Sequence, residues 1–232
     1  MSLFMNRKIE VRKTYFKDGT LKSACYYVGS IREGLSSFYY RSGCLKEETI
    51  YKNGVLDGIN KTYHENGETF QVKTSKNGRI EGRVWEFYES GKLCWEVYYE
   101  EGLEHGVSKR YDAYGSCVAE MLYDRGKLSG IARSYYGDGK LWAERSFKND
   151  MLNGLTTVYD EKGRLWAKLS FEDDILSGLC FEYYKDEKLM QQRNYKDDML
   201  DGLSKLYSKT GRLNAVIQFR KGKIEFENRY SY

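Results

Sequence analysis

Apolar and polar residues alternate with a period of two over short runs of this chain, which is the pattern of half-buried β-strands. The runs 155–159 and 165–171 show it clearly. Between them, the tetrapeptide Asp-Glu-Lys-Gly at 160–163 is typical of a type I turn closed by a glycine in the left-handed region. The pair 173–174 forms the return turn, because Asp tolerates positive φ there. The stretch 154–177 therefore predicts one β-hairpin and the turn to the next.

This hairpin unit recurs every 24 residues along nearly the whole chain. A glycine opens each copy, and the series consists of Gly34, Gly58, Gly82, Gly106, Gly130, Gly154, Gly178 and Gly202. We interpret these as structural glycines that shape the backbone. Each lies within a strand, where glycine is unfavourable, so we expect an aromatic side chain of a neighbouring strand to cover the bare backbone.

Successive hairpins with connections too short for a helix predict an all-β fold. We expect a single elongated, curved antiparallel meander sheet built from 24-residue β-hairpin repeats. The expected organisation is an N-terminal starting strand in 1–16, about eight to nine repeats in 17–220 and a C-terminal capping strand in 221–232, in one continuous domain.

The second strand of the unit carries an apolar series at positions 165, 167, 169 and 171, and we predict that its face is concave and packed. On the same side, the middles of the first strands form a basic and aromatic column, which we predict to line a binding groove: Lys61, Trp85, Lys109, Arg133, Phe181 and Lys205. A carboxylate column is expected on the opposite face: Glu48, Glu96, Glu120 and Glu144. The alternative is that these charges only keep a long sheet soluble.

Composition narrows the class of protein. The net charge of +4 is small and the Lys and Arg residues are dispersed, which disfavours nucleic acid as the partner. The five cysteines contain no CxxC and favour free thiols in a reducing compartment. Because 1–13 lacks the apolar core of a signal peptide and no apolar run is long enough for a membrane span, we expect a cytoplasmic protein. No catalytic, metal or cofactor site is predicted.

Two segments carry a resemblance to a known family: Tyr63-His64-Glu65-Asn66-Gly67 and Tyr195-Lys196-Asp197-Asp198-Met199-Leu200-Asp201-Gly202. The pattern resembles the MORN-repeat variant, and similar bacterial arrays are grouped as the YwqK-like antitoxin family and among immunity proteins. The resemblance covers nearly the whole chain and implies a non-enzymatic β-array that binds another macromolecule. It brings no catalytic residues.

Three functions follow as alternatives. The first is an inhibitor of antitoxin or immunity type that occludes a partner protein, such as a toxin or effector. The second is an inhibitor of a host defence complex, encoded by a mobile element. The third is a module that binds anionic membranes or nucleic acid, for which a tighter basic cluster would be expected. An open sheet with two ends also allows an end-to-end homodimer.

Overall fold

The computed structural model describes residues 8–230, and all regular structure within them is β-strand. No helix able to cross a membrane occurs in that range. Contacts divide the chain into two compact units, of which unit 1 ends at Gly115 and unit 2 begins at Ser116. Of the predicted terminal segments, 1–7 and 231–232 lie outside the described residues. One continuous domain stays a prediction.

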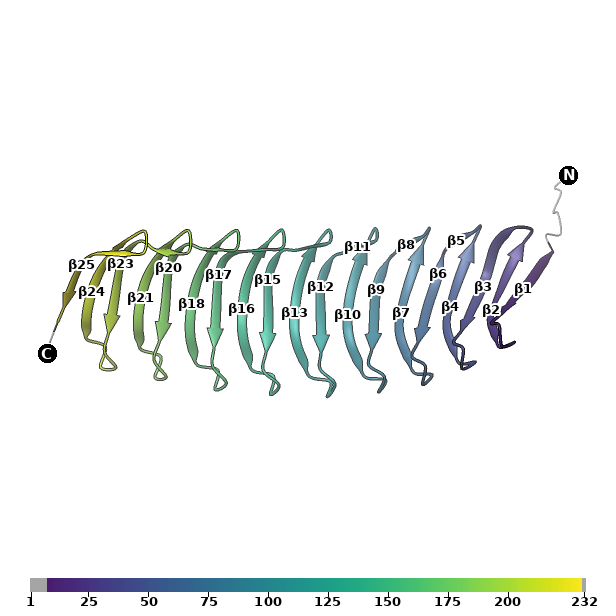
Figure 1. Cartoon of the computed structure of the whole chain (residues 1–232), viewed down its shortest axis with the longest axis horizontal. Helices are drawn as coiled ribbons and strands as arrows, with labels where there is room; N and C mark the ends of the chain where they lie inside the picture. Colours follow the sequence, from purple (N-terminus) through teal and green to yellow (C-terminus); the bar gives the residue numbers. More distant parts are fainter. Residues whose placement is uncertain (1–7, 231–232) are drawn as a thin grey trace. The chain divides into compact units, whose positions relative to one another are not determined.

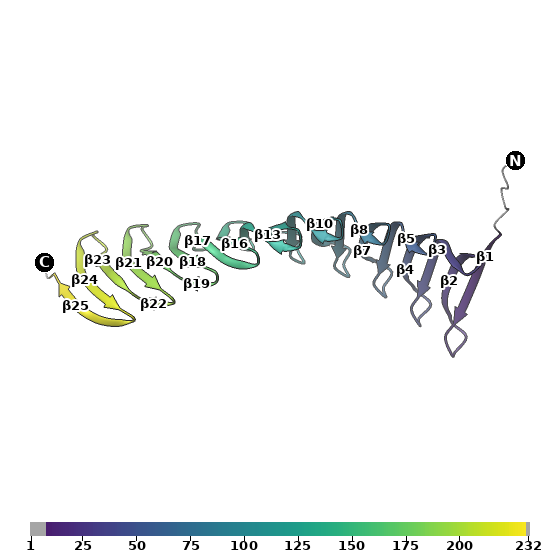
Figure 2. The ribbon, with the colours of Figure 1, turned by 90° about the horizontal axis from the view of Figure 1, so that it is seen from above.

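Between residues 8 and 230, twenty-five strands form antiparallel hairpins, so the predicted all-β meander of hairpin repeats is confirmed. Figures 1 and 2 show the strands of each unit following one another side by side, the long ones bowed along their length. The strands of unit 1 are β1 (Ile9–Tyr15), β2 (Leu21–Val28), β3 (Ile31–Tyr39), β4 (Leu45–Lys52), β5 (Val55–Leu56), β6 (Gly58–Tyr63), β7 (Thr69–Lys76), β8 (Arg79–Ile80), β9 (Gly82–Phe87), β10 (Leu93–Glu100), β11 (Leu103–Glu104) and β12 (Gly106–Tyr111).

The strands of unit 2 are β13 (Cys117–Asp124), β14 (Lys127–Leu128), β15 (Gly130–Tyr135), β16 (Leu141–Lys148), β17 (Met151–Tyr159), β18 (Leu165–Glu172), β19 (Ile175–Leu176), β20 (Gly178–Tyr183), β21 (Leu189–Lys196), β22 (Met199–Leu200), β23 (Gly202–Tyr207), β24 (Leu213–Arg220) and β25 (Lys223–Arg229). The first strand begins earlier than predicted in β17, as it also does in β3, whereas in the repeats between and after them, up to β23, a separate two-residue strand such as β19 precedes it. The opening residues of β17 pair with the end of the preceding strand, which leaves only two residues for the return turn.

The register within a hairpin corrects the predicted faces. In β17 and β18, Tyr159 pairs with Leu165 but Val158 pairs with Ala167, because Trp166 is an extra residue at a β-bulge. Paired residues share a face and neighbours along a strand do not, so Leu165 and Ala167 lie on opposite faces. The predicted single apolar series is therefore wrong, since strict alternation ignored the bulge.

Two faces can now be defined for every hairpin. The small-residue face carries Thr156, Val158 and Ala167 and their equivalents. Its buried members are short, and they include Ser36, Asn60, Val84, Ser108, Ala132, Ala143, Thr156, Ala167, Cys180, Ser204 and Ala215. The leucine face carries Leu155, Thr157 and Tyr159 and their equivalents. Most of the side chains buried in the middle of the small-residue face are short, whether they are polar or apolar, and Gln191 and Ile217 are longer exceptions.

The four-residue turn has the predicted form. The Gly163 amide donates to the Asp160 carbonyl at 2.8 Å, the Asp160 amide donates to the Arg164 carbonyl at 2.9 Å, and Gly163 has φ +78°. Glu187 takes the place of this glycine one repeat later and adopts φ +61°. The Asp160 carboxylate also accepts the Lys162 amide at 2.9 Å. The turn is thus closed by backbone and side-chain hydrogen bonds together.

The return turns from 53–54 to 221–222 have two central residues at positive φ, the type I′ geometry that suits the twist of a hairpin. Asp173 and Asp174 have φ +50° and +67°, as the sequence predicted for Asp at these positions. Asp174 also binds the preceding hairpin at two points. Its amide donates to the Leu152 carbonyl at 2.9 Å, and its Oδ1 accepts the Leu152 amide at 2.6 Å. Backbone groups that the strand ladder leaves unpaired are satisfied in this way.

The opening glycines all have positive φ, from +75° to +138°. Gly154, at φ +108°, lies where β17 bulges away from β16, and a Cβ there would approach the Cβ of Ser146 at 3.1 Å. Phe171 is the cross-strand partner of Gly154, but the atoms nearest to that added Cβ belong to Ser146 and not to the Phe171 ring. The expectation that an aromatic ring takes the place of the missing side chain is therefore wrong. The bulged backbone conformation requires the glycine.

Candidate binding surfaces

The predicted basic column lies on the leucine face, directly beside the predicted carboxylate column. Glu48 pairs with Lys61, Glu96 with Lys109, and Glu120 with Arg133, each across adjacent strands of the same unit. Placing the two columns on opposite faces was wrong, for the same reason that the apolar series was wrong. Opposite charges face one another across the strands, as favourable cross-strand pairs do.

Arg133 shows how these charges are bound. Its Nε donates to Glu144 at 2.8 Å, and this hydrogen bond raises the pKa of the guanidinium. On the other side, Glu120 accepts the Tyr135 hydroxyl at 2.9 Å. Burial, followed by that hydrogen bond, raises the pKa of Tyr135 to about 12. The carboxylates therefore link the basic column to the tyrosines, which weakens any positive field along this part of the face.

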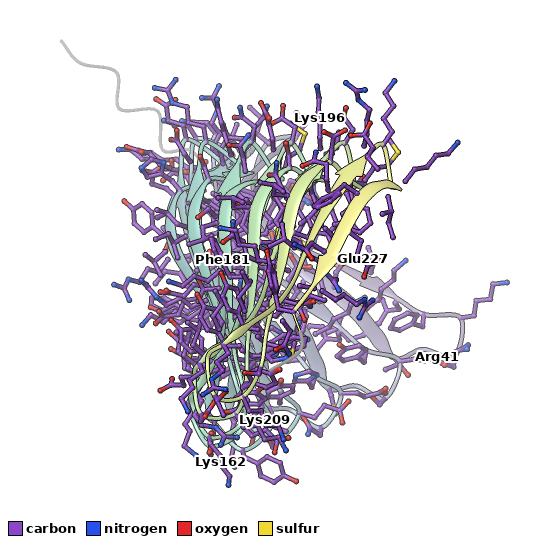
Figure 3. All side chains as sticks on the ribbon, turned by 90° about the vertical axis from the view of Figure 1, so that its left-hand side faces the viewer. Arg41, Lys162, Phe181, Lys196, Lys209 and Glu227 are labelled. Atoms are coloured by element: carbon purple, nitrogen blue, oxygen red, sulfur yellow. The ribbon has the colours of Figure 1, made fainter. Side chains whose placement is uncertain are left out.

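The remaining members of the column have different neighbours. Trp85 pairs with Val72 on one side and Glu96 on the other. Phe181 pairs with Lys168 and Gln192, and Lys205 with Gln192 and Val216. In Figure 3, Phe181 lies between the edge that carries Lys196 and the edge that carries Lys162 and Lys209. All six predicted residues occupy one equivalent position of successive repeats, and their binding role stays a prediction.

The sequence analysis missed a row of exposed aliphatic side chains on the leucine face, which we call the aliphatic row. It comprises Leu35, Ile59 and Val107 in unit 1 and Ile131, Leu155, Leu179 and Leu203 in unit 2. Each is the residue after an opening glycine, and each is between 40 % and 51 % exposed. The signal was available, because an aliphatic residue at the same position of successive repeats is visible in the sequence. Arg83 is the one polar residue at this position in repeats 34–202.

A second missed feature is a hollow at the four-residue-turn edge of unit 2, which we call the aromatic hollow. Its volume is about 630 Å³. Aromatic and apolar side chains from β16, β17, β18, β20 and β21 and the adjoining turns line it: Tyr136, Trp142, Val158, Tyr159, Trp166, Tyr183, Tyr184 and Met190. The polar lining consists of Asp160, Glu161, Lys162, Arg164 and Lys185. Lys162 marks this edge in Figure 3.

Hydrogen bonds hold the polar rim of the aromatic hollow in place. Arg164 donates from Nε and Nη2 to the Asp160 carboxylate at 2.9 and 2.6 Å. This pairing, with the backbone donors of Arg164 and Lys162, lowers the pKa of Asp160 to about 2. The carboxylate is thus charged at neutral pH and compensates the guanidinium. The hollow presents mainly aromatic surface with little net charge.

A fold of stacked hairpins with long exposed surfaces is the architecture of a repeat-based binding module. Comparison with protein families agrees: the MORN repeat variant model matches residues 32–53, 128–149 and 176–197. The matched segments cover a strand and its neighbour in β3–β4, β15–β16 and β20–β21. No curated protein matches the sequence.

Two solved structures that the chain resembles carry the titles "Crystal Structure of TcdB2-TccC3-Cdc42" and "Crystal Structure of TcdB2-TccC3", with TM-scores of 0.23 and 0.25. Each is 11 % identical, and the match covers 91 % of this chain and 14 % of that chain. The chain therefore spans about a seventh of their length. Scores this low carry no argument about fold or function.

Proposed function

We propose that this chain is a non-enzymatic inhibitor that binds a partner protein and occludes part of its surface. The observation that carries the proposal is the aliphatic row. Large aliphatic side chains exposed at equivalent positions along a face mark protein interaction sites more often than single exposed residues do. The MORN-variant repeats support a binding role. An antitoxin or immunity protein acting in the cytoplasm on a toxin or effector is the form we favour.

The charge arrangement on the leucine face favours a protein over nucleic acid or an anionic membrane. Both of those partners need unpaired cations, because affinity comes from Lys and Arg that neutralise phosphates. Here Lys61, Lys109 and Arg133 each have a glutamate directly opposite. Apolar contacts with a rim of paired charges are typical of protein interfaces. An inhibitor of a host defence complex would use the same surface and is distinguished by its target.

The test is affinity capture from the native host with three forms of the purified chain. The wild type should retain a partner that the Leu179→Glu, Leu203→Glu double variant loses. Lys209→Glu, an exposed charge reversal at the four-residue-turn edge, lies outside the aliphatic row and is the matched control that should retain the partner. The purified partner should lose its own activity when the wild type is added and recover it with the double variant.

Two outcomes would contradict this proposal. Retention by the double variant would remove the aliphatic row from the interface. Binding that collapses between about 50 and 200 mM salt would indicate nucleic acid or lipid instead. Sedimentation of the purified chain would test separately whether it forms the predicted homodimer.

A further inference from the structure

The aromatic hollow is built from the same position of successive hairpins. Trp142 on β16, Trp166 on β18 and Met190 on β21 are each the second residue of their strand, one repeat apart. Trp142 and Trp166 are 40 % and 54 % exposed. Large rings that remain so exposed at equivalent positions form a regular platform across the strands.

The walls of this platform are fixed while the indole edges remain available. The Tyr136 hydroxyl donates to the Tyr159 carbonyl at 2.9 Å, and the Tyr184 hydroxyl donates to the Tyr207 carbonyl at 2.8 Å. The Trp142 ring lies 6.5 Å from that of Tyr136, with the Arg145 guanidinium 4.8 Å from its centre. Within residues 8–230, neither Trp142 nor Trp166 donates a hydrogen bond through its indole N–H.

The distance between Trp142 and Trp166 indicates which ligand conformation could contact both rings. Strands β16, β17 and β18 are adjacent, so Trp142 and Trp166 are two strand spacings apart, or about 10 Å. A polyproline II helix rises ~3.1 Å per residue with three residues per turn, which gives about 9 Å per turn. Every third residue of such a helix, laid across the strands, would therefore meet an equivalent ring.

The chemistry of a polyproline II segment also matches that of the aromatic hollow. Its backbone carbonyls have no internal hydrogen bonds and can accept the two indole N–H groups. Its proline rings are apolar and rigid, so they pack on aromatic rings with little loss of conformational entropy. Lining charges nearly cancel, with three cations (Lys162, Arg164, Lys185) against two carboxylates (Asp160, Glu161). Single-stranded nucleic acid would need a more continuous basic track.

We propose that the aromatic hollow binds a proline-rich peptide segment in the polyproline II conformation, with prolines every third residue seated on Trp142 and Trp166. The segment runs across the strands from β16 towards β21. This site is separate from the aliphatic row, and the proposal does not depend on the inhibitory role. It identifies a peptide-recognition site of its own within unit 2.

Calorimetric titration of the full chain with synthetic peptides of about twelve residues, or about four turns, tests the proposal. One peptide has prolines at every third position, and a second has the same composition with the prolines moved out of that phase. The in-phase peptide should bind at least about tenfold more tightly. A third peptide with alanine in place of proline should bind more weakly still. Equal affinity for all three would overturn the proposal.

Variants locate the site. Trp142→Leu and Trp166→Leu should each weaken binding of the in-phase peptide by about tenfold or more, as loss of a central aromatic anchor does. Trp166→Phe keeps a ring but loses the indole N–H, so its affinity for the in-phase peptide should lie between those of the wild type and Trp166→Leu. Leu203→Glu in the aliphatic row is the control and should bind like the wild type.

Circular dichroism and thermal unfolding of each variant separate loss of the site from loss of the fold. A Trp166→Leu variant that keeps the wild-type spectrum and still binds normally would contradict the proposal. Oligothymidylate and a β-linked oligosaccharide serve as competing ligands. The proposal predicts that neither of these ligands displaces the peptide. If either one binds more tightly than the in-phase peptide, the proposal is overturned.

Discussion

The Tyr135 hydroxyl donates a 2.9 Å hydrogen bond to Glu120, which lies one strand back on the neighbouring hairpin. The same relationship occurs in unit 1, where the Tyr63 hydroxyl donates to Glu48 at 2.9 Å. Each carboxylate also faces a basic residue across the strands. The middle of the leucine face is therefore a cross-linked polar network between hairpins, and this network decides how the face responds to pH and to charge reversal.

We expect the stability that Tyr135 contributes to be lost at high pH. Its pKa is raised from 10.0 to about 12 in the folded chain, so the folded state holds the proton more tightly than the unfolded state. The contribution is fully present below about pH 10 and is lost as the pH rises towards 12. Difference titration of tyrosinate absorbance between the wild type and Tyr135→Phe measures the midpoint. A midpoint near 10 would show that burial and the hydrogen bond to Glu120 do not together hold the proton on Tyr135 in solution.

Gly154→Ala should destabilise the chain by about 1–3 kcal/mol, because an L-residue is strained at φ +108° and its Cβ would crowd Ser146. Gly163→Asn is the matched control. It lies at φ +78° with no atom within 4 Å of an added Cβ, and Asn tolerates that region. Denaturant unfolding of both variants gives the comparison. Equal losses would mean that positive φ alone, without the bulge geometry, sets the requirement.

Ser204→Ala should raise the free energy of unfolding by about 1 kcal/mol, since the Ser204 hydroxyl is buried without a hydrogen-bond partner among the described residues. Cys180 and Ala132 occupy the same position in other repeats, so an apolar side chain fits there. Ser75→Ala is equally buried but removes the acceptor of the Asn60 Nδ2 at 2.8 Å, and it should lower stability instead. Opposite signs in thermal unfolding are expected, and a loss in both variants would contradict the first assignment.

Arg133→Glu should destabilise by about 1 kcal/mol, because it places a carboxylate between Glu120 and Glu144. Lys205→Glu is the control on the same face and faces Gln192 and Val216, so its cost should be smaller. The difference between the two variants should shrink as salt is added, since these charges are partly exposed. If Lys205→Glu costs as much as Arg133→Glu, the cross-strand glutamates are not the cause.

Periodicity predicted most of the fold, because the sequence pattern of each turn and strand recurs from repeat to repeat. The turn at 160–163 and the Asp pair at 173–174 have conformations set by their own residues, so local sequence was sufficient. The β-bulge at Trp166 was not visible in the sequence, since it depends on how two strands pair. One extra residue there changes which residues of β18 share a face with the first strand of the hairpin: Thr157 shares its face with Lys168, not with Ala167. This explains the wrong placement of the charge columns.

The candidate surfaces were harder to predict than the fold. Lys61 and Arg133 were identified by their regular spacing, but spacing alone does not show that glutamates lie opposite them. Trp142 and Trp166 share one position of the repeat, yet only the structure shows that their side chains border one hollow. The aliphatic row was readable after each glycine, but the burial of an apolar residue on a single-layer sheet cannot be judged without its neighbours.

The bond pair between Asp174 and Leu152 has a consequence for how such a chain can change in length. Asp198 contacts Leu176 through the same two atoms, at 3.1 and 2.8 Å. If 24 residues between these turns were removed, Asp198 would lie opposite Leu152 and could form the same two hydrogen bonds that Asp174 forms with Leu152. Recombination between copies within unit 2 can thus add or delete a module without inventing a new junction, so the number of modules is free to evolve to the size of whatever the chain binds.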